Sequence, residues 1–222
     1  MAERVPEFAL LIGVFLGLSS TVSAAVLTGT LFRPLLFGVV VGYPFVAFGI
    51  VRSDDPSEAL PPKLILGIGV ALGVLTVGAA LLERPSVGIV PALLAAALVV
   101  LPPAAYATRF GADVNPLSPI QTLVACAAVG AAFVAFAPLV GSLSAVLGLV
   151  IGLSGALYAD ARGFRPTYRQ QRLGVVAGVV VGVAVAWFGL SMRLPLEATV
   201  MAPVVLVLAP SLFVALTRAK RK

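Results

Sequence analysis

The 222-residue sequence contains no histidine and a single cysteine, Cys126. Without histidine, the usual ligand sets for haem, zinc and copper cannot be assembled. One cysteine excludes an internal disulfide and any metal or iron–sulfur site that needs several thiolates. We therefore predict no metal site, no cofactor and no catalytic residues of these kinds.

Charged residues are also scarce. They make up 11% of the chain, whereas a soluble domain has about a quarter, and hydrophobic residues make up 60% with a mean hydropathy of +1.12. A membrane-crossing helix needs about 20 apolar residues, so eight such helices would use about 160 positions and leave no room for a soluble domain. We predict an all-α, polytopic integral membrane bundle of about eight transmembrane helices, forming a single membrane domain over residues 1–222.

Apolar segments follow one another along the whole chain. They run from about Phe8 to Leu31, Pro34 to Val51, Leu64 to Leu82, Ser86 to Ala107, Leu117 to Tyr158, Leu173 to Leu190 and Ala198 to Leu216. The stretch from Leu117 to Tyr158 carries no charge and is about twice as long as one crossing requires. We expect it to form a hairpin of two helices that turns around Ala137, Pro138 and Gly141.

The first apolar segment could also be read as a cleaved signal peptide, with Val22 and Ala24 at the small cleavage positions. Two features favour an uncleaved helix instead. Glu3 and Glu7 offset Arg4 and the terminal amine, so the start is not positively charged, and the apolar run continues beyond the cleavage positions.

The most basic run lies between residues 160 and 172, where four arginines accompany Asp160. They are Arg162, Arg165, Arg169 and Arg172. Cytoplasmic loops of membrane proteins are rich in Lys and Arg, so this run is expected inside the cell. That orientation places both termini in the cytoplasm and leaves only Arg33, Arg84 and Arg193 of the 15 basic residues outside. We predict an integral protein of the plasma membrane.

The net charge of +6 comes from positions at the edges of apolar segments. Basic residues at those depths attract anionic lipid headgroups. We therefore expect the lipid bilayer, and anionic lipids at Arg162, Arg165, Arg169 and Arg172, as partners, and no binding of nucleic acid.

Glycines recur at a spacing of four residues. The residues concerned are Gly13, Gly17, Gly38, Gly42, Gly69, Gly73, Gly148, Gly152, Gly174, Gly178 and Gly182. Lipid provides no hydrophobic force between helices, so association depends on close backbone approach, which glycines on one helix face permit. We predict that these glycines pack helices together.

An internal duplication is a further hypothesis. Shifting the chain by 109 positions matches Gly69 with Gly178, Gly73 with Gly182 and Arg84 with Arg193. The halves 1–115 and 116–222 would then be two four-helix repeats in the same orientation. The alternative is that hairpins rich in small residues resemble one another without any duplication, and the sequence leaves both readings open.

Hydroxyl side chains cluster in the first apolar segment, at Ser19, Ser20, Thr21 and Ser23. Ser19, Ser20 and Ser23 could line a polar path through the membrane. Hydroxyls at such positions more often donate to the backbone of their own or a neighbouring helix.

No apolar segment carries an Asp, Glu, Lys or Arg in its interior. Such residues mark proton relays and ion sites, so their lack favours a passive carrier for a small uncharged or weakly polar solute. The alternative is an accessory subunit of a larger membrane complex, bound to a membrane protein partner or to a second copy of the chain. A third reading is an interfacial enzyme built on Asp113, Asn115, Arg109 and the loop 160–172. These residues lack paired acids and an activated nucleophile, so the sequence favours a protein without enzymatic activity but leaves the question open.

Overall fold

The computed structural model describes residues 5–53, 55–83, 88–111, 113–164 and 167–219. All regular elements in these ranges are helices. Six of them, α1, α2, α4, α5, α8 and α9, are long and apolar enough to cross a membrane. The structure therefore agrees with the prediction of an all-α protein with several membrane-spanning helices.

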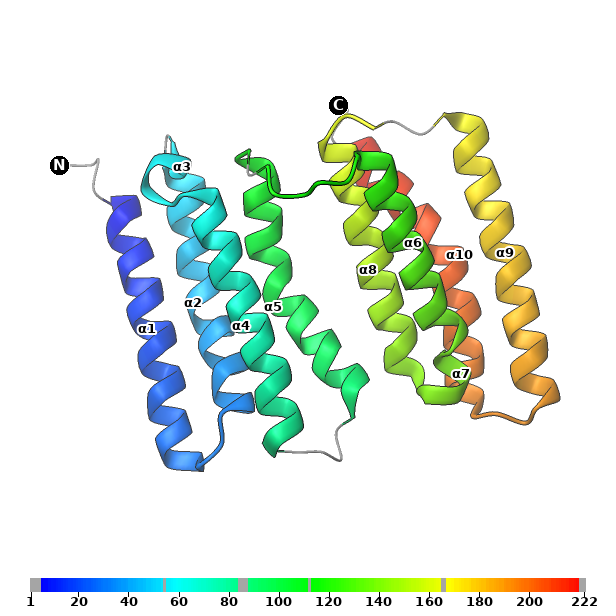
Figure 1. Cartoon of the computed structure of the whole chain (residues 1–222), viewed down its shortest axis with the longest axis horizontal. Coiled ribbons are helices and arrows are strands. Elements are labelled where there is room, and N and C mark those ends of the chain that lie inside the picture. Colours follow the sequence, from blue (N-terminus) through cyan, green and yellow to red (C-terminus); the bar gives the residue numbers. More distant parts are fainter. Residues whose placement is uncertain (1–4, 54, 84–87, 112, 165–166, 220–222) are drawn as a thin grey trace. The chain divides into compact units, whose positions relative to one another are not determined.

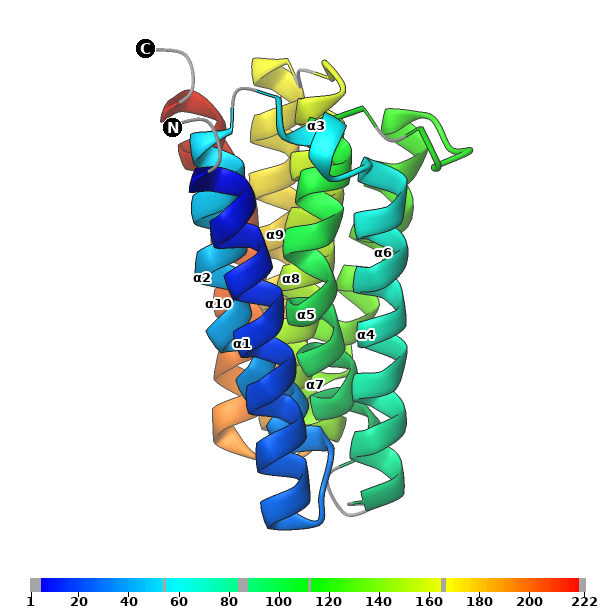
Figure 2. The same ribbon diagram turned by 90° about the vertical axis from the view of Figure 1, so that its left-hand side faces the viewer.

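The chain divides into two compact units, and the first comprises Met1–Ala112. Its helices are α1 (Val5–Thr28), α2 (Phe32–Arg52), α3 (Pro56–Ala59), α4 (Pro62–Glu83) and α5 (Ile89–Arg109). α1 packs against α2 and α4 against α5, which gives two helical hairpins (Figures 1 and 2). The short helix α3 was not predicted, because its four residues are too few to show a helical pattern.

The second unit comprises Asp113–Lys222. Its helices are α6 (Pro119–Ala135), α7 (Ala137–Val140), α8 (Ser142–Ala161), α9 (Tyr168–Ser191) and α10 (Leu196–Ala219). α6 pairs with α8 and α9 with α10, and α10 also packs on α8. The predicted turn after α6 is the single-turn helix α7, and Gly141 ends it with φ at 111°. α6 and the described apolar part of α10, Leu196–Pro210, are shorter than the six long spans.

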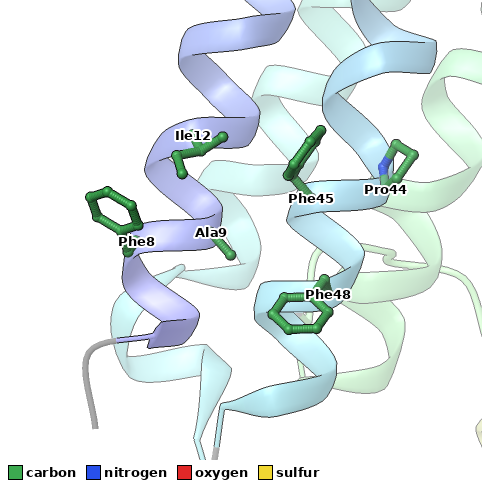
Figure 3. Close-up of a pocket in the computed structure, with 6 residues that line it drawn as sticks. All are labelled: Phe8, Ala9, Ile12, Pro44, Phe45 and Phe48. Atoms are coloured by element: carbon green, nitrogen blue, oxygen red, sulfur yellow. The ribbon is translucent and has the colours of Figure 1, made fainter. Parts of the chain in front are cut away.

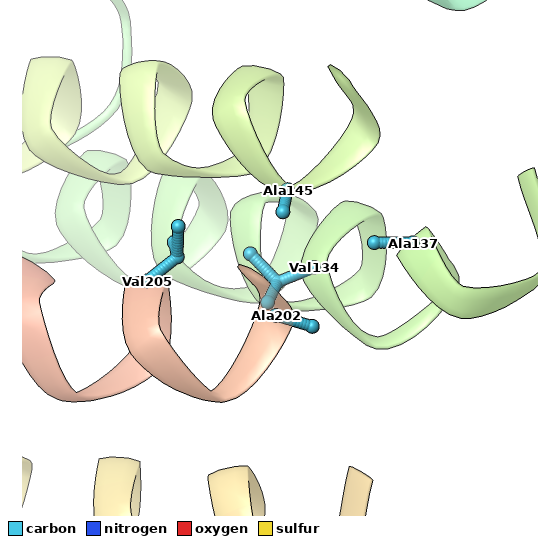
Figure 4. Close-up of a cluster of buried hydrophobic side chains, with 5 residues drawn as sticks. All are labelled: Val134, Ala137, Ala145, Ala202 and Val205. Atoms are coloured by element: carbon cyan, nitrogen blue, oxygen red, sulfur yellow. The ribbon is translucent and has the colours of Figure 1, made fainter. Parts of the chain in front are cut away.

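Small side chains fill the interior of each unit, and large apolar ones cover the outside. In the second unit, Val134, Ala137, Ala145, Ala202 and Val205 form a buried cluster between α6, α7, α8 and α10 (Figure 4). The described surface includes many exposed large hydrophobic residues, among them Leu27 at 85% and Trp187 at 76% exposure. This distribution suits a lipid environment, where outward apolar side chains cost nothing and small interior residues let helices approach.

Glycines form the contact between the first two helices of each unit. A Cβ on Gly17 would lie 3.0 Å from the carbonyl oxygen of Gly38, and one on Gly42 would lie 3.0 Å from that of Gly13. In the second unit, a Cβ on Gly130 of α6 would lie 2.6 Å from the carbonyl oxygen of Gly148 on α8. The backbones of α1 and α2, and of α6 and α8, therefore touch directly.

In the other hairpin of each unit, glycines meet prolines. A Cβ on Gly69 of α4 would lie 2.5 Å from the Pro103 ring of α5. On α9, a Cβ on Gly178 would lie 2.5 Å from the carbonyl oxygen of Leu206, and one on Gly182 would lie 3.3 Å from Pro203 of α10. Both hairpins thus rest a proline-containing helix on the glycine face of its partner.

Two predicted packing glycines differ from the rest. A Cβ on Gly174 would have no atom within 4 Å, and the same holds for Gly152. Gly152 still contributes its backbone, because a Cβ on Gly130 would lie 3.2 Å from its nitrogen. Gly73 lies close to Val100 of α5, with 2.5 Å between its virtual Cβ and a methyl carbon. A spacing of four residues between glycines therefore predicts which helix face packs, but not which of its glycines touches a neighbouring helix.

These differences allow a matched pair of substitutions within α9. Gly178→Ala places a methyl group against the Leu206 carbonyl, so we expect it to cost about 1–3 kcal/mol of stability, as overpacking does. Gly174→Ala meets open space and should be neutral or stabilising, because alanine favours a helix by up to about 1 kcal/mol over glycine. Thermal unfolding in identical lipid nanodiscs measures the difference, and equal melting temperatures for the two variants would contradict the assigned contact.

Candidate functional site

The centre of the first unit is the proline-interrupted helix α5. Pro103 has no N–H, so the carbonyl of Val99, four residues earlier, loses its usual helical partner. The hydroxyl of Tyr43 on α2 donates to this carbonyl at 2.5 Å. Figure 1 shows that α5 changes direction partway along its length, as expected beside a proline pair. A hydrogen bond from a neighbouring helix thus satisfies the polar group that the proline exposes.

Gly69 of α4 packs against Pro103 from the neighbouring helix. The ring of Pro103 occupies the space that a side chain at position 69 would fill. We call Tyr43, Gly69, Val99 and Pro103 the proline centre of the first unit. A proline pair within a helix predicts a bend, but the sequence did not predict the role of Tyr43. A lone tyrosine in an apolar helix gives no signal of its partner, although a buried hydroxyl requires one.

The second unit repeats the theme on α10, which contains Pro203 and Pro210. Pro210 deprives the Leu206 carbonyl of its helical N–H, and Gly178 of α9 lies directly against that oxygen. Such a close approach permits weak Cα–H···O contacts. Thr199, four residues before Pro203, is 1% exposed and packs on Gly189, and its hydroxyl has no hydrogen-bond partner among the described residues.

A carboxylate joins the two hairpins of each unit at one end. Glu83, the last residue of α4, accepts hydrogen bonds from the N–H groups of Leu31 and Phe32 at the start of α2. In the second unit, Glu197 accepts from the hydroxyl of Ser142, the first residue of α8, at 2.7 Å. A helix N-terminus has unsatisfied N–H groups and favours negative charge. Neither contact was predicted from the sequence.

At the other end of the first unit, Tyr106 holds the loop around α3. Its buried hydroxyl lies 2.7 Å from the carbonyl oxygen of Leu60 and 2.9 Å from that of Pro56. Asp55 caps α3 by accepting from the N–H and hydroxyl of Ser57, and these hydrogen bonds lower the pKa of its carboxyl group. The loop between α2 and α4 is therefore fixed to α5.

The clustered hydroxyl residues of α1 have different surroundings. Thr21 donates to the Gly17 carbonyl of its own helix at 2.8 Å and lies against Gly38 of α2. Ser19 and Ser20 are half-buried, and Ser23 is exposed. Whether these serines line a polar path stays a prediction.

The basic run connects α8 to α9. The Arg162 guanidinium lies 5.6 Å from the ring centroid of Tyr158, a cation–π distance. Arg169 and Arg172 are exposed in the first two turns of α9, while Arg165 lies outside the described residues. Cations at a helix N-terminus oppose the helix dipole. Whether these arginines contact lipid headgroups stays a prediction.

The residues considered for an interfacial enzyme do not form a catalytic group in the described ranges. The side-chain amide of Asn115 donates to Thr122 at 2.8 Å and accepts from the N–H of Leu117, so it shapes the start of α6. Asp113 is exposed. No cluster of three or more acidic or cysteine side chains suited to a metal occurs among the residues that the structure describes.

No protein-family model, no curated protein and no solved structure matches this chain. Function must therefore be inferred from the chain's own residues.

The proline centre yields a double-mutant test. Tyr43→Phe leaves the Val99 carbonyl without a partner in an apolar interior, which should cost about 1–3 kcal/mol. In a Pro103→Ala background the restored N–H of residue 103 can bond that carbonyl, so the same change should cost less than half as much. Unfolding free energies of the four proteins in one lipid composition measure the coupling. Equal costs in both backgrounds would show that Tyr43 does not serve the carbonyl exposed by Pro103.

Proposed function

We propose that the protein is a passive carrier for a small uncharged or weakly polar solute. The observation that carries this proposal is the packing of α5 and α10, each interrupted by two prolines, on glycine faces of α4 and α9. A proline bend weakens a helix at one point, and a glycine face offers no side chains to obstruct a sliding neighbour. Each unit therefore contains a helix suited to move between two packed positions.

The polar groups near these bends suit an uncharged solute. They are the carbonyls from which Pro103, Pro203 and Pro210 remove an N–H, together with the hydroxyls of Tyr43 and Thr199. Tyr43 already donates to the Val99 carbonyl and Gly178 covers the Leu206 carbonyl, so a solute would reach these two carbonyls only after the bent helix moves. Groups of this kind form hydrogen bonds with hydroxyl and amide solutes but provide no countercharge for an ion. The interiors of the apolar segments contain no charged side chain, which fits the same class of solute.

We propose eight membrane crossings, adding α6 and α10 to the six long spans. α10 has 24 residues, a length of about 36 Å, and α6 has 17, about 25 Å, to which α7 adds a further turn. The hydrocarbon core is about 30 Å thick. An even number of crossings keeps both termini on one side, and the basic run supports the cytoplasmic side of the plasma membrane.

We also propose that the units are parallel four-helix repeats. Each is built from two hairpins, glycine contacts join the first pair of helices, and glycine–proline contacts join the second. The match of Gly69 and Gly73 with Gly178 and Gly182 supports this relation, because all four lie on the glycine faces of α4 and α9. Such repeats are common in transporters.

We expect the solute to move only down its own concentration gradient, at a rate that does not depend on pH. The chain has no histidine, and its acidic residues lie outside the interiors of the spans, so no embedded group should change charge between about pH 5.5 and pH 8. Entry of glycerol or urea into proteoliposomes, measured by stopped-flow light scattering, should exceed that into protein-free liposomes and vary less than about twofold over that range.

Two results would contradict the carrier. Accumulation of solute driven by a pH gradient would show coupling to protons, and flux equal to that of empty liposomes for all tested solutes would remove the transport activity. The second result would favour the accessory subunit.

One observation favours that second candidate, an accessory subunit of a membrane complex. Among the described side chains of α1 only Gly13 is buried, and in α9 only Gly182 and Gly189 are. Apart from the face that packs on its hairpin partner, each helix leaves its side chains uncovered within its unit, and a partner helix or a second copy of the chain could cover them as well as lipid does. Recovery of a fixed partner after mild extraction from native membranes would discriminate this candidate from a free-standing carrier.

A further inference from the structure

An open apolar groove runs between α1 and α2 of the first unit. Its volume is about 440 Å³, within the range of about 300–1,000 Å³ typical of small-molecule sites. Phe8, Ala9 and Ile12 line it from α1, and Pro44, Phe45 and Phe48 line it from α2 (Figure 3). Phe8 is 64% exposed, so the groove opens to the surroundings of the helices and not to the interior of the unit.

The shape of the groove follows from its two walls. Farther from the start of α1, glycines of α1 and α2 bring the backbones together, with Gly13 against Gly42. Toward the start of α1 the residues become larger and the rings of Phe8, Phe45 and Phe48 stand apart around Ala9 (Figure 3). A glycine contact that gives way to aromatic side chains thus leaves a slot with a closed inner end and an open mouth.

A cation stands at the edge of this groove. The guanidinium of Arg52, the last residue of α2, lies 5.7 Å from the ring centroid of Phe48, a cation–π distance. A guanidinium has five N–H donors, more than one ring contact can occupy, so donors remain for an anion such as phosphate. Phe48 therefore serves both as a wall of the groove and as the support for the cation.

The depth of these groups matches a lipid molecule. Phe48 precedes Arg52 by four residues, which is about 6 Å along a helix, and Arg52 ends a span that can cross a membrane. The groove would then lie about one turn inside the membrane edge, at the level of the upper acyl chain, with the cation at the level of the headgroup.

We propose that this groove binds a glycerophospholipid, with one acyl chain against Phe8, Phe45 and Phe48 and the phosphate on the Arg52 guanidinium. Both parts of the molecule are required. The apolar walls take the acyl chain, and the Arg52 cation at the edge of the groove selects lipids that carry a phosphate. This site is separate from the basic run after α8 and does not depend on the proposed transport.

Native mass spectrometry of the full-length protein, released from detergent containing phosphatidylglycerol or diacylglycerol, tests the proposal. Unaltered protein should retain phosphatidylglycerol in preference to diacylglycerol, which lacks the phosphate. Arg52→Gln should lower phosphatidylglycerol retention about fivefold, the effect expected for one cation at a membrane edge, and should abolish the preference. Ala9→Phe fills the groove and should lower retention of both lipids.

Two control variants have the same chemistry elsewhere in the first unit. Arg109→Gln removes an exposed cation at the end of α5, and Ala47→Phe adds a ring on an exposed position of α2 outside the groove. Both should bind lipid as the unaltered protein does.

Equal losses in the test and control variants would overturn the site, as would an Ala9→Phe protein that keeps its lipid. A shift from dimer to monomer in Ala9→Phe, with lipid retention unchanged, would assign the groove to a second copy of the chain instead. Arg52 is exposed, so Arg52→Gln should fold normally. The test therefore remains valid even if Ala9→Phe fails to fold.

Discussion

Direct contact between helix backbones is the interaction on which each unit depends. Lipid supplies no hydrophobic force between helices, so attraction comes from dispersion and weak polar contacts that act only at short range. Gly17 against Gly38, and Gly130 against Gly148, bring carbonyl oxygens to the surface of the next helix. The small interior and the large apolar exterior both follow from this requirement.

Prolines add the second constraint. Each proline inside a helix leaves one carbonyl without its N–H, and a membrane interior has no water to replace it. The first unit supplies the Tyr43 hydroxyl to the Val99 carbonyl, and the second brings Gly178 of α9 against the Leu206 carbonyl. A neighbouring helix therefore covers each of these two carbonyls, and the glycine faces of α4 and α9 are where the proposed movement would occur.

Much of the fold could be predicted from the sequence, because length, hydropathy and charge directly determine membrane spans. The turn at Ala137 and Pro138 and the lack of strands among the described residues follow from the same signals. Which glycines touch a neighbour could not be predicted, because a spacing of four fixes a helix face but not what lies opposite. Gly174 and Gly178 share a face of α9, yet only Gly178 meets another helix.

The polar contacts were less predictable still. Tyr43 reaches across to another helix, and Glu83 reaches the start of α2. Each contact joins or positions groups whose partners depend on how hairpins pack, which no local pattern encodes. The single-turn helix α3 was not predicted for a different reason. Its cap at Asp55 lies in a polar loop whose sequence resembles that of any other turn.

The central claim of the proposed mechanism is that α5 moves about its proline bend. Pulsed electron–electron double resonance between two spin labels measures that movement directly. The labels are placed at Val26→Cys on α1 and Ile89→Cys on α5 of a Cys126→Ser protein in lipid nanodiscs. Both labelled positions are exposed and belong to the same unit. The account predicts two distance populations that merge into one when Pro102 and Pro103 are both replaced by alanine. A single narrow distance that is the same with and without the prolines would contradict it.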